Sequence, residues 1–275
     1  MIFVLAPTFK ETDLVDRFIE NWLPHLTDNL QIIIVNANAG DASSEIIREY
    51  NNQADITEIP APADFFWSGQ IRLGLTHITK KFSPGDTIIL TNIDVAPPRE
   101  VIHSVLSSLD TLQALSLSTF TGTEFLHYGS KLGIIPRHFT FQSGAKRLIL
   151  DYAPTRFLAF KPESKNDILL PNDEDFPHYA GDYELTLRMT HHGYRIEGCN
   201  TYTAFNDSTN TGVKRAEDIN TLEDLTSNIR SALALNTRKK FYKFAYRNPE
   251  RFVILALLYF QTAAYIAKYW LRRDR

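Results

Sequence analysis

The sequence predicts an α/β fold in which a mostly parallel sheet is flanked by helices. Within about the first 110 residues, a short apolar segment followed by a segment of helical character occurs four times, an alternation that favours a parallel sheet with right-handed crossovers. The apolar segments are continuous runs of Ile, Val and Leu, which is typical of strands buried on both faces. They end in small or acidic polar residues, at the edge where open α/β sheets bind their ligands.

The first strand and helix are expected within residues 3–26. Residues 3–6 form a short apolar run that is closed by Pro7-Thr8. An amphipathic helix is predicted over 13–26, because apolar side chains recur there every four residues: Leu14, Phe18, Trp22 and Leu26. Thr12 is its expected N-cap.

The second apolar run, residues 32–35, ends in a small polar loop before a predicted helix over 43–50. The loop reads Asn36-Ala37-Asn38-Ala39-Gly40-Asp41. It either contacts a nucleotide or is a plain connecting turn. It is not a phosphate-cradling glycine loop, because neither G-x-G-x-x-G nor G-x-x-x-x-G-K is present.

The run that starts at Asp86 ends abruptly in Asn92-Ile93-Asp94. A strand over 56–60 and a helix over 70–80 are predicted before it, and a helix over 99–109 after it. A carboxylate at the carboxyl end of a buried strand is well placed to hold a divalent metal against a phosphate. The alternative is that Asn92 and Asp94 only begin a turn, since both residue types favour turns and Pro97-Pro98 follow.

The later part of the chain is less regular. Strands are expected over 114–120, 157–160 and 194–205, turns and short strands over 122–145, and helices over 183–192 and 221–235. Five carboxylates fall within residues 173–184, which alone would indicate a solvated acidic loop. However, Tyr179-Ala180-Gly181 is small and apolar for such a loop, which indicates that the adjacent Asp182 lies at a pocket.

Composition places the chain among ordinary globular proteins. Its 275 residues are 44% hydrophobic and 22% charged, and this length is enough to bury a large core. One cysteine, Cys199, excludes an internal disulfide framework and fits a reducing compartment. The first residues lack a basic n-region and are interpreted as a strand instead of a signal peptide.

The C-terminal segment combines positive charge with the most apolar stretch of the chain. Residues 238–275 carry ten Lys and Arg against two Asp and Glu, a net charge of +8, which leaves −11 for residues 1–237. Residues 252–271 are apolar except at Gln261, Thr262 and Lys268. This pairing favours an anionic membrane surface over nucleic acid as the partner. A helix in the membrane interface, a membrane span, and a helix packed on the protein or on a second subunit all stay open.

Taken together, these segments resemble a family-2 glycosyltransferase of the GT-A fold, over roughly residues 2–212. The resemblance rests on the order and spacing of five motifs: Val4-Leu5-Ala6-Pro7-Thr8-Phe9, Ile33-Ile34-Val35-Asn36-Ala37-Asn38-Ala39-Gly40-Asp41, Trp67-Ser68-Gly69-Gln70-Ile71-Arg72, Thr91-Asn92-Ile93-Asp94-Val95, and Gly181-Asp182-Tyr183-Glu184. Within the family it is most similar to rhamnosyltransferase-like enzymes of surface polysaccharide biosynthesis.

The resemblance implies an inverting, metal-dependent transfer of a sugar from a nucleotide-diphosphate donor to an acceptor hydroxyl. Asp94 would ligate Mg²⁺ or Mn²⁺, with Asp207 as a candidate further ligand. Asp182 would be the catalytic base, and Glu184 would orient the acceptor or Arg188, or else be only an acid at a helix N-terminus. The implied nucleotide-binding residues are Pro7, Thr8, Asn36, Asn38, Trp67, Gly69, Arg72 and Asn92.

The sequence also departs from the family pattern. Asn36 stands where an aspartate usually reads the base, Ala180-Gly181 replaces an acidic pair, and Asn206-Asp207 occupies the region of a usual metal-binding histidine. A catalytically inactive, membrane-attached binding module therefore stays an alternative. A nucleotidyltransferase is the other, although residues 6–10 lack the glycines of a triphosphate loop.

The predicted organisation is a GT-A domain over 1–215 and a helical region over 216–275, with the membrane-associating tail at 238–275. The protein is expected to be cytoplasmic and peripheral on the inner face of the cell membrane. The expected partners are a nucleotide-diphosphate sugar and a saccharide or lipid-linked saccharide acceptor of bacterial cell-surface polysaccharide assembly, with no nucleic acid. A homodimer stays open.

Overall fold

The computed structural model describes residues 1–25, 29–97, 102, 109–121, 124–126, 129–133, 136–139, 148–206 and 219–273. Within these residues the largest element is a sheet with the strand order β10-β12-β6-β11-β4-β1-β2-β3. Its strands are β1 (Ile2–Thr8), β2 (Leu30–Asn36), β3 (Ile56–Pro60), β4 (Thr87–Thr91), β6 (Gln113–Thr121), β10 (Leu148–Leu150), β11 (Phe157–Lys161) and β12 (Arg195–Asn206). The short strands β5 (Val95–Ala96) and β7 (Glu124–Leu126) pair with β12 and β6, and β8 (Gly129–Lys131) pairs separately with β9 (Arg137–Phe139).

The predicted mostly parallel sheet is confirmed in the first half of the chain. Strands β3, β2, β1 and β4 run parallel, and β12 runs parallel to β6. The exception is β11, which is antiparallel to both β4 and β6 and joins the two parallel groups. Its first residue, Phe157, therefore lies opposite Thr91 at the carboxyl end of β4.

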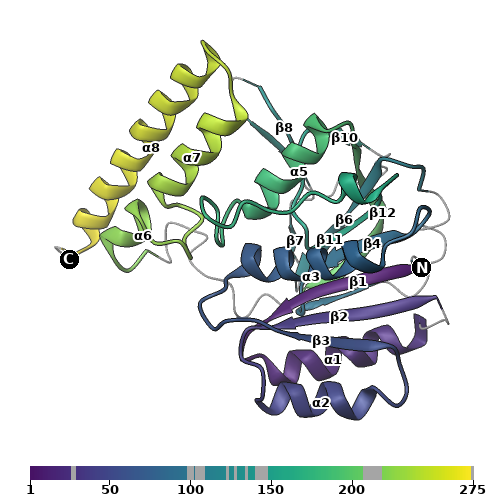
Figure 1. Ribbon diagram of the computed structural model, residues 1–275. Coiled ribbons are helices and arrows are strands. Elements are labelled where there is room, and N and C mark those ends of the chain that lie inside the picture. Colours follow the sequence, from purple (N-terminus) through teal and green to yellow (C-terminus); the bar gives the residue numbers. More distant parts are fainter. Residues whose placement is uncertain are drawn as a thin grey trace.

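Helices cover both faces of the sheet, as the unbroken apolar runs predicted (Figure 1). Along β1, Val4 and Ala6 belong to one core cluster while Phe3 and Leu5 belong to another, because successive side chains point to opposite faces. Helices α1 (Thr12–Trp22) and α2 (Ala42–Tyr50) pack on the first face. Helices α3 (Trp67–Lys81) and α5 (Gly181–His191) pack on the second.

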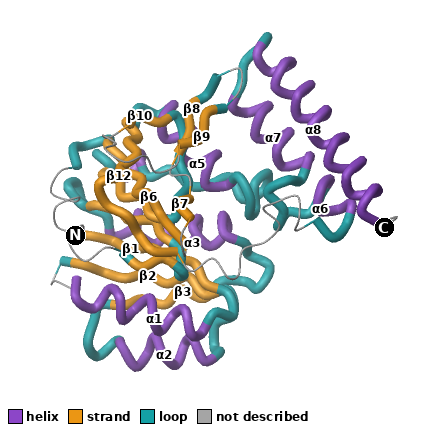
Figure 2. Tube along the Cα trace, turned by 180° about the vertical axis from the view of Figure 1, so that it is seen from behind, coloured by secondary structure: helices purple, strands orange, loops and turns teal. Residues whose placement is uncertain are grey.

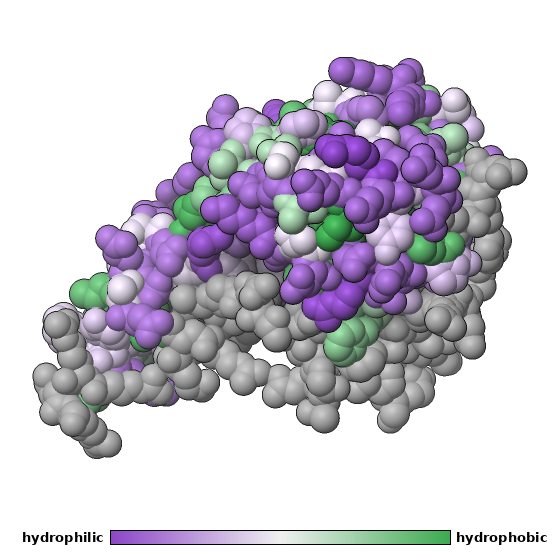
Figure 3. All heavy atoms as spheres, turned by 90° about the horizontal axis from the view of Figure 1, so that it is seen from below, coloured by the Kyte–Doolittle hydropathy of each residue, from purple (hydrophilic) through white to green (hydrophobic). Residues whose placement is uncertain are grey.

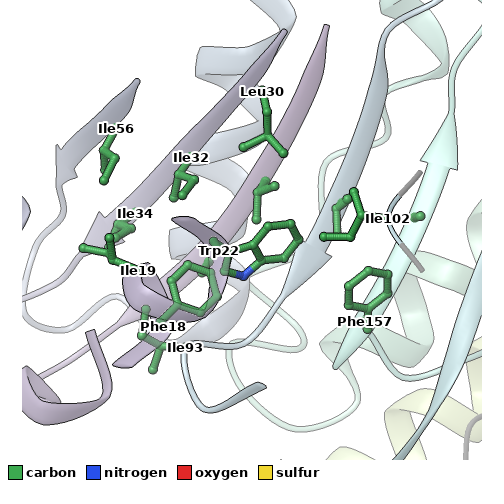
Figure 4. Packing of buried hydrophobic residues seen from close by; sticks show 14 of the residues in the cluster. Phe18, Ile19, Trp22, Leu30, Ile32, Ile34, Ile56, Ile93, Ile102 and Phe157 are labelled. Carbon is green, nitrogen blue, oxygen red and sulfur yellow. The ribbon is translucent and has the colours of Figure 1, made fainter. Parts of the chain in front are cut away.

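Aromatic side chains join distant segments in the first cluster (Figure 4). Trp22 of α1 is fully buried, and its ring stacks on that of Phe157 at a centroid distance of 6.4 Å and an interplanar angle of 3°. Phe18 lies against Trp22 at 6.0 Å. The outer side of this layer is mostly hydrophilic where it is coloured in Figure 3, with isolated apolar side chains, as expected for helices that face solvent.

The C-terminal helices form a separate layer beyond α5. They are α6 (Leu222–Thr226), α7 (Leu235–Ala245) and α8 (Glu250–Arg273). Figures 1 and 2 show α7 and α8 side by side, with α8 outermost. Phe241 of α7 packs in a small cluster with Tyr152, Phe176 and Leu187, which attaches this layer to α5 and to the segment before it.

Two predictions of helix boundaries are wrong for local reasons. Thr12 is the first residue of α1 and Glu11 is its N-cap; the Thr12 hydroxyl lies 3.2 Å from that of Ser43 instead. The expected helix over 221–235 ends at Thr226, since the side chains of Asn228 and Ser231 accept bonds from the backbone N–H groups of Arg230 and Leu233. Such bonds offer the backbone an alternative to the helix.

Other boundaries differ by a few residues. α1 ends at Trp22 and is followed by a 3₁₀ turn at Leu23–His25, and α3 begins three residues before the expected position. A second 3₁₀ turn lies at Lys165–Asp167. The predicted helix over 99–109 falls almost entirely outside the described residues.

Candidate active site

A cleft of about 410 Å³ lies at the carboxyl ends of β1 and β4. Six segments line it: the end of β1 with the start of α1, the first turns of α3, the residues after β4, the residues before β11, the segment that leads into α5, and the turn between α6 and α7. Its lining residues are Pro7, Thr8, Phe9, Glu11, Trp67, Gln70, Asn92, Ile93, Asp94, Thr155, Arg156, His178, Tyr179, Asp182 and Arg230. This is the edge of an open α/β sheet at which ligands bind.

Asn92 and Asp94 reach the cleft because successive side chains after β4 point alternately into the core and toward the cleft. Ile93 and Val95 are buried, whereas Asn92 and Asp94 are partly exposed. The side-chain oxygen of Asn92 is buried and has no hydrogen-bond partner among the described residues. A carboxylate and an amide oxygen side by side are oxygen ligands of the kind that Mg²⁺ and Mn²⁺ prefer.

Glu11 stands near Asp94. Burial raises the pKa of the Glu11 carboxyl, and the negative charge of Asp94 raises it further. A cation between the two segments would relieve this repulsion. Within the described residues no group of three or more His, Cys, Asp and Glu is arranged to hold a metal ion. Asp94 would therefore bind a cation together with oxygens of the ligand, and Asp207, the other candidate ligand, lies outside the described residues.

Asp182 reaches the cleft from the first turn of α5. The residue before the helix, Ala180, has the left-handed backbone conformation with φ = 64°, which turns the chain into the helix. Gly181 then packs so closely that a Cβ there would lie 2.1 Å from Ser68 Oγ and 2.9 Å from the Phe176 carbonyl oxygen. The Ser68 N–H donates to the Pro177 carbonyl at 3.0 Å, and the Ser68 hydroxyl donates to the Phe176 carbonyl. The start of α3 therefore fixes Asp182.

The Asp182 carboxyl is held in a mixed environment. Burial raises its pKa to about 6, although the charge of Arg156 and the backbone N–H groups of Tyr183 and Thr155 oppose this shift. The Tyr183 N–H donates to Asp182 Oδ1 at 2.9 Å. Near neutral pH the group is thus a carboxylate with a raised proton affinity, a combination that suits a general base.

Other predicted nucleotide-binding residues in the cleft are Pro7, Thr8 and Trp67. The Thr8 N–H donates to Gln70 Oε1 at 3.1 Å, and Gln70 Nε2 donates to the Phe65 carbonyl at 3.0 Å. Gln70 thus ties β1 to the start of α3, so that both segments face the cleft together.

The remaining predicted residues do not line the cleft. Asn36 is fully buried at the end of β2, where its Nδ2 donates to Glu58 Oε1 at 2.9 Å, and Asn38 Nδ2 donates to Asp41 Oδ2 at 2.9 Å. Asp41 is the N-cap of α2. Gly69 is buried in α3 against the Phe65 ring.

Arg72 and Glu184 face a second hollow of about 680 Å³ on the other side of α5. Arg72 pairs with Asp173 at 3.1 Å. Glu184 is 3% exposed and accepts from Arg188 Nε at 2.7 Å and from the Asn172 N–H at 3.2 Å. Of the roles expected for Glu184, its contacts are those of a residue that orients Arg188.

Several cleft residues were not among the predicted site residues. Phe9 and Gln70 lie inside quoted motifs, and Glu11 and Tyr179 lie within two residues of one, so neighbourhood in sequence could have indicated them. Thr155, Arg156 and Arg230 had no such signal. Arg230 lies between α6 and α7, in a segment that the sequence predicts to be helical.

A model of one family matches residues 3–161, more than half of the chain, and its description is glycosyl transferase family 2. The chain belongs to glycosyltransferase family 2. The expected family, the GT-A fold and the enzyme class are thereby confirmed. Comparison with curated proteins found no significant match.

Solved glycosyltransferases share the fold at low sequence identity. A mannosyltransferase of Pyrobaculum calidifontis, solved with GDP-Man and Mn²⁺, has a TM-score of 0.57 at 12% identity, over 97% of this chain and 74% of its own. Residues 1–349 of S. aureus TarS have a TM-score of 0.53 at 11% identity, over 75% of this chain and 60% of that fragment. GalNAc-T7, solved with UDP, GalNAc and Mn²⁺, has a TM-score of 0.57 at 8% identity, over 75% of this chain and 43% of its own. The family-2 chain therefore spans less than two thirds of the TarS fragment and of GalNAc-T7.

Proposed function

We propose that this family-2 glycosyltransferase performs an inverting, metal-dependent transfer of a sugar from a nucleotide-diphosphate donor to an acceptor hydroxyl. The observation that carries the proposal is that Asp94 and Asp182 line one cleft, the first after β4 and the second at the start of α5. The two carboxylates have different environments, as needed for two different roles. Neighbours of the same fold were solved with GDP-Man or UDP and with Mn²⁺, which supports a nucleotide-sugar donor and a divalent metal.

In this proposal Asp94 would hold Mg²⁺ or Mn²⁺ with oxygens of the donor, and Asn92 would assist through water or the ribose. The bound ion supplies Lewis-acid neutralisation of the charge on the leaving diphosphate. Pro7, Thr8 and Trp67 line the same cleft, where they would border the donor. The proposed roles of Asn36, Asn38, Gly69 and Arg72 would have to be indirect, through the loops and the helix that they stabilise.

Asp182 is the proposed base. The acceptor oxygen attacks the anomeric carbon of the donor sugar, its proton passes to the Asp182 carboxylate, and the bond from the anomeric carbon to the diphosphate oxygen breaks with both electrons leaving on the diphosphate. Attack from the side opposite to the leaving group inverts the anomeric configuration. Glu184 would act indirectly, because it pairs with Arg188. Arg188 Nη2 in turn donates to the carbonyl of Leu170, which precedes the acidic loop.

Residues 1–215 form the proposed transferase domain, and residues 216–275 a helical region that attaches to the membrane. The described part of the chain has one helix, residues 250–271, that is long and apolar enough to cross a bilayer, with a mean hydropathy of 1.4. Its outward side chains include Phe252, Phe260 and Leu271, which are 68%, 77% and 70% exposed. With ten basic residues in 238–275, this favours a helix that lies in an anionic membrane surface.

The proposed location is therefore the inner face of the cell membrane. A lipid-linked saccharide of bacterial cell-surface polysaccharide assembly would be a suitable acceptor there.

The test of the proposed function is release of the nucleoside diphosphate from a panel of nucleotide sugars, with Mn²⁺ and with membrane extract as the source of acceptor. We expect turnover of one donor, a loss of about 100-fold or more in Asp182→Asn, and unchanged donor binding in that variant. Turnover that is unchanged in Asp182→Asn would contradict the proposed base. Binding without turnover in the wild type would favour the inactive binding module.

A further inference from the structure

Arg230 is a cation of the cleft that has no carboxylate partner among the described residues. Its backbone N–H donates to Asn228 Oδ1 at 2.9 Å, which fixes the turn between α6 and α7. Three other basic side chains near the acidic loop are paired: Arg72 with Asp173, Arg188 with Glu184 and Lys240 with Asp175. The guanidinium of Arg230 therefore stays available to a ligand.

The position of Arg230 is on the His178 side of the cleft. Its positive charge adds to burial in lowering the pKa of His178, to about 4. By comparison, the charge of Asp94 raises the pKa of Glu11, and the charge of Arg156 lowers the pKa of Asp182. The turn between α6 and α7 thus brings Arg230 close to His178, in the segment that leads into the proposed base.

His178 supplies a second polar group at this place. Its Nδ1 is buried and has no hydrogen-bond partner among the described residues. The ring packs between Phe66 and Tyr179, at centroid distances of 6.0 Å and 5.1 Å. A buried polar atom without a partner costs free energy unless a ligand satisfies it. A neutral imidazole can donate one N–H to an anionic oxygen.

We propose that Arg230 binds a phosphate group of the acceptor, with His178 as a second donor to the same group. The inference rests on the proposed function, because it names the class of acceptor for that site. A guanidinium presents two parallel N–H groups that match the oxygens of a phosphate. The diphosphate of the donor is the other phosphate source, but its proposed place is at Asp94 with the metal ion. A phosphate-linked saccharide held at Arg230 would present its hydroxyl to Asp182.

The test uses octyl phosphate as the probe and octyl glucoside as its uncharged match, in calorimetric titrations of the full chain. Both are titrated with and without Mn²⁺ and a saturating nucleoside diphosphate. We expect octyl phosphate to bind with the donor site filled, and Arg230→Gln to weaken it about tenfold or more, the loss of a charge-assisted bond. Arg230→Lys should retain part of the affinity. The matched control is Arg48→Gln, an exposed arginine in the last turn of α2 that lies outside the cleft lining.

Three results would overturn the inference. In the first, Arg230→Gln weakens the binding of octyl phosphate and of octyl glucoside equally. In the second, it weakens the binding of the nucleoside diphosphate but not that of octyl phosphate. In the third, it changes the binding of neither octyl phosphate nor the nucleoside diphosphate. The second result would assign Arg230 to the donor. Failure of the proposed function is recognised separately, because it removes metal-dependent nucleotide binding in the wild type, whereas the titration without nucleotide still reports on Arg230.

Discussion

Asp182 is subject to opposing effects on its carboxyl group, and these determine how the reaction should depend on pH. Burial raises its pKa to about 6, and the charge of Arg156 lowers it. A base acts only when it is deprotonated, so kcat/KM should rise with pH through about 6 and level off above it.

Removing the charge of Arg156 should move this profile in a known direction. In Arg156→Gln the carboxylate loses a favourable charge, its pKa rises, and the rising limb of the kcat/KM profile shifts to higher pH. Lys161→Gln is the matched control, since Lys161 is the last residue of β11, the strand that Arg156 directly precedes. A profile in Arg156→Gln that stays in place or moves to lower pH would show that another group is being titrated.

At the residue scale, the sequence predicted the two carboxylates better than the rest of the cleft. Asp94 follows a buried strand, and Asp182 follows a small apolar segment, so both stand at recognisable ends of elements. Arg156 and Arg230 lie in irregular segments, where position depends on the packing of β11 against β4 and on the turn after α6. No local pattern encodes such positions.

At the scale of elements, the junction between α3 and α5 decides the geometry of the site. Gly181 lies against Ser68 and the backbone of Phe176, and Ser68 is hydrogen-bonded to the segment before α5. The contact with a backbone oxygen leaves no flexible side chain to move away.

Gly181→Ala should therefore displace the first turn of α5. We expect a loss of stability of about 1–3 kcal/mol, the usual cost of overpacking, together with a fall in kcat that exceeds the effect on donor binding. Denaturant unfolding and steady-state kinetics measure the two. The control is Thr76→Ala at an exposed position of α3, which should change neither by much. A Gly181→Ala variant of full stability and activity would refute the importance of this contact.

Elements with a strong apolar repeat were predicted well, and those determined by distant partners were not. β3 was predicted at its observed bounds, Ile56–Pro60. The antiparallel direction of β11 was not predictable, because a buried antiparallel strand has the same apolar run as a parallel one. The helix expected over 221–235 failed because side chains of Asn and Ser bond to the backbone, which an apolar repeat does not reveal.

At the scale of the whole molecule, the C-terminal layer links the proposed membrane surface to the cleft. α8 packs through Ile254, Leu258 and Thr262, which are 2% to 5% exposed. Arg238 of α7 donates to Gln261 of α8 at 2.7 Å. Lys240 of α7 pairs with Asp175 at 2.9 Å, and the acidic loop continues from there to His178. One continuous set of contacts therefore runs from α8 to the cleft.

Flotation with vesicles tests the proposed membrane surface. The full chain should float with vesicles that contain anionic lipid and less with neutral ones, and Phe252→Ser with Phe260→Ser should abolish flotation by removing exposed apolar area. Thr226→Ala is the control, because the Thr226 hydroxyl makes only a solvent-exposed hydrogen bond to the Leu222 carbonyl within α6. If the wild type does not float and sedimentation shows a dimer that the two Phe substitutions dissociate, α8 is a subunit interface instead.

The most direct test of the central claim is a calorimetric titration of nucleoside diphosphates with and without Mn²⁺, on the wild type and on Asp94→Asn. Glu163→Gln is the matched control, because Glu163 follows β11 at the amino end of β4, opposite to the cleft. We predict that one nucleotide binds only with Mn²⁺, that Asp94→Asn removes this binding, and that Glu163→Gln retains it. Metal-dependent binding that survives in Asp94→Asn, or no binding of any nucleotide to the wild type, would contradict the assignment of Asp94 to the donor site.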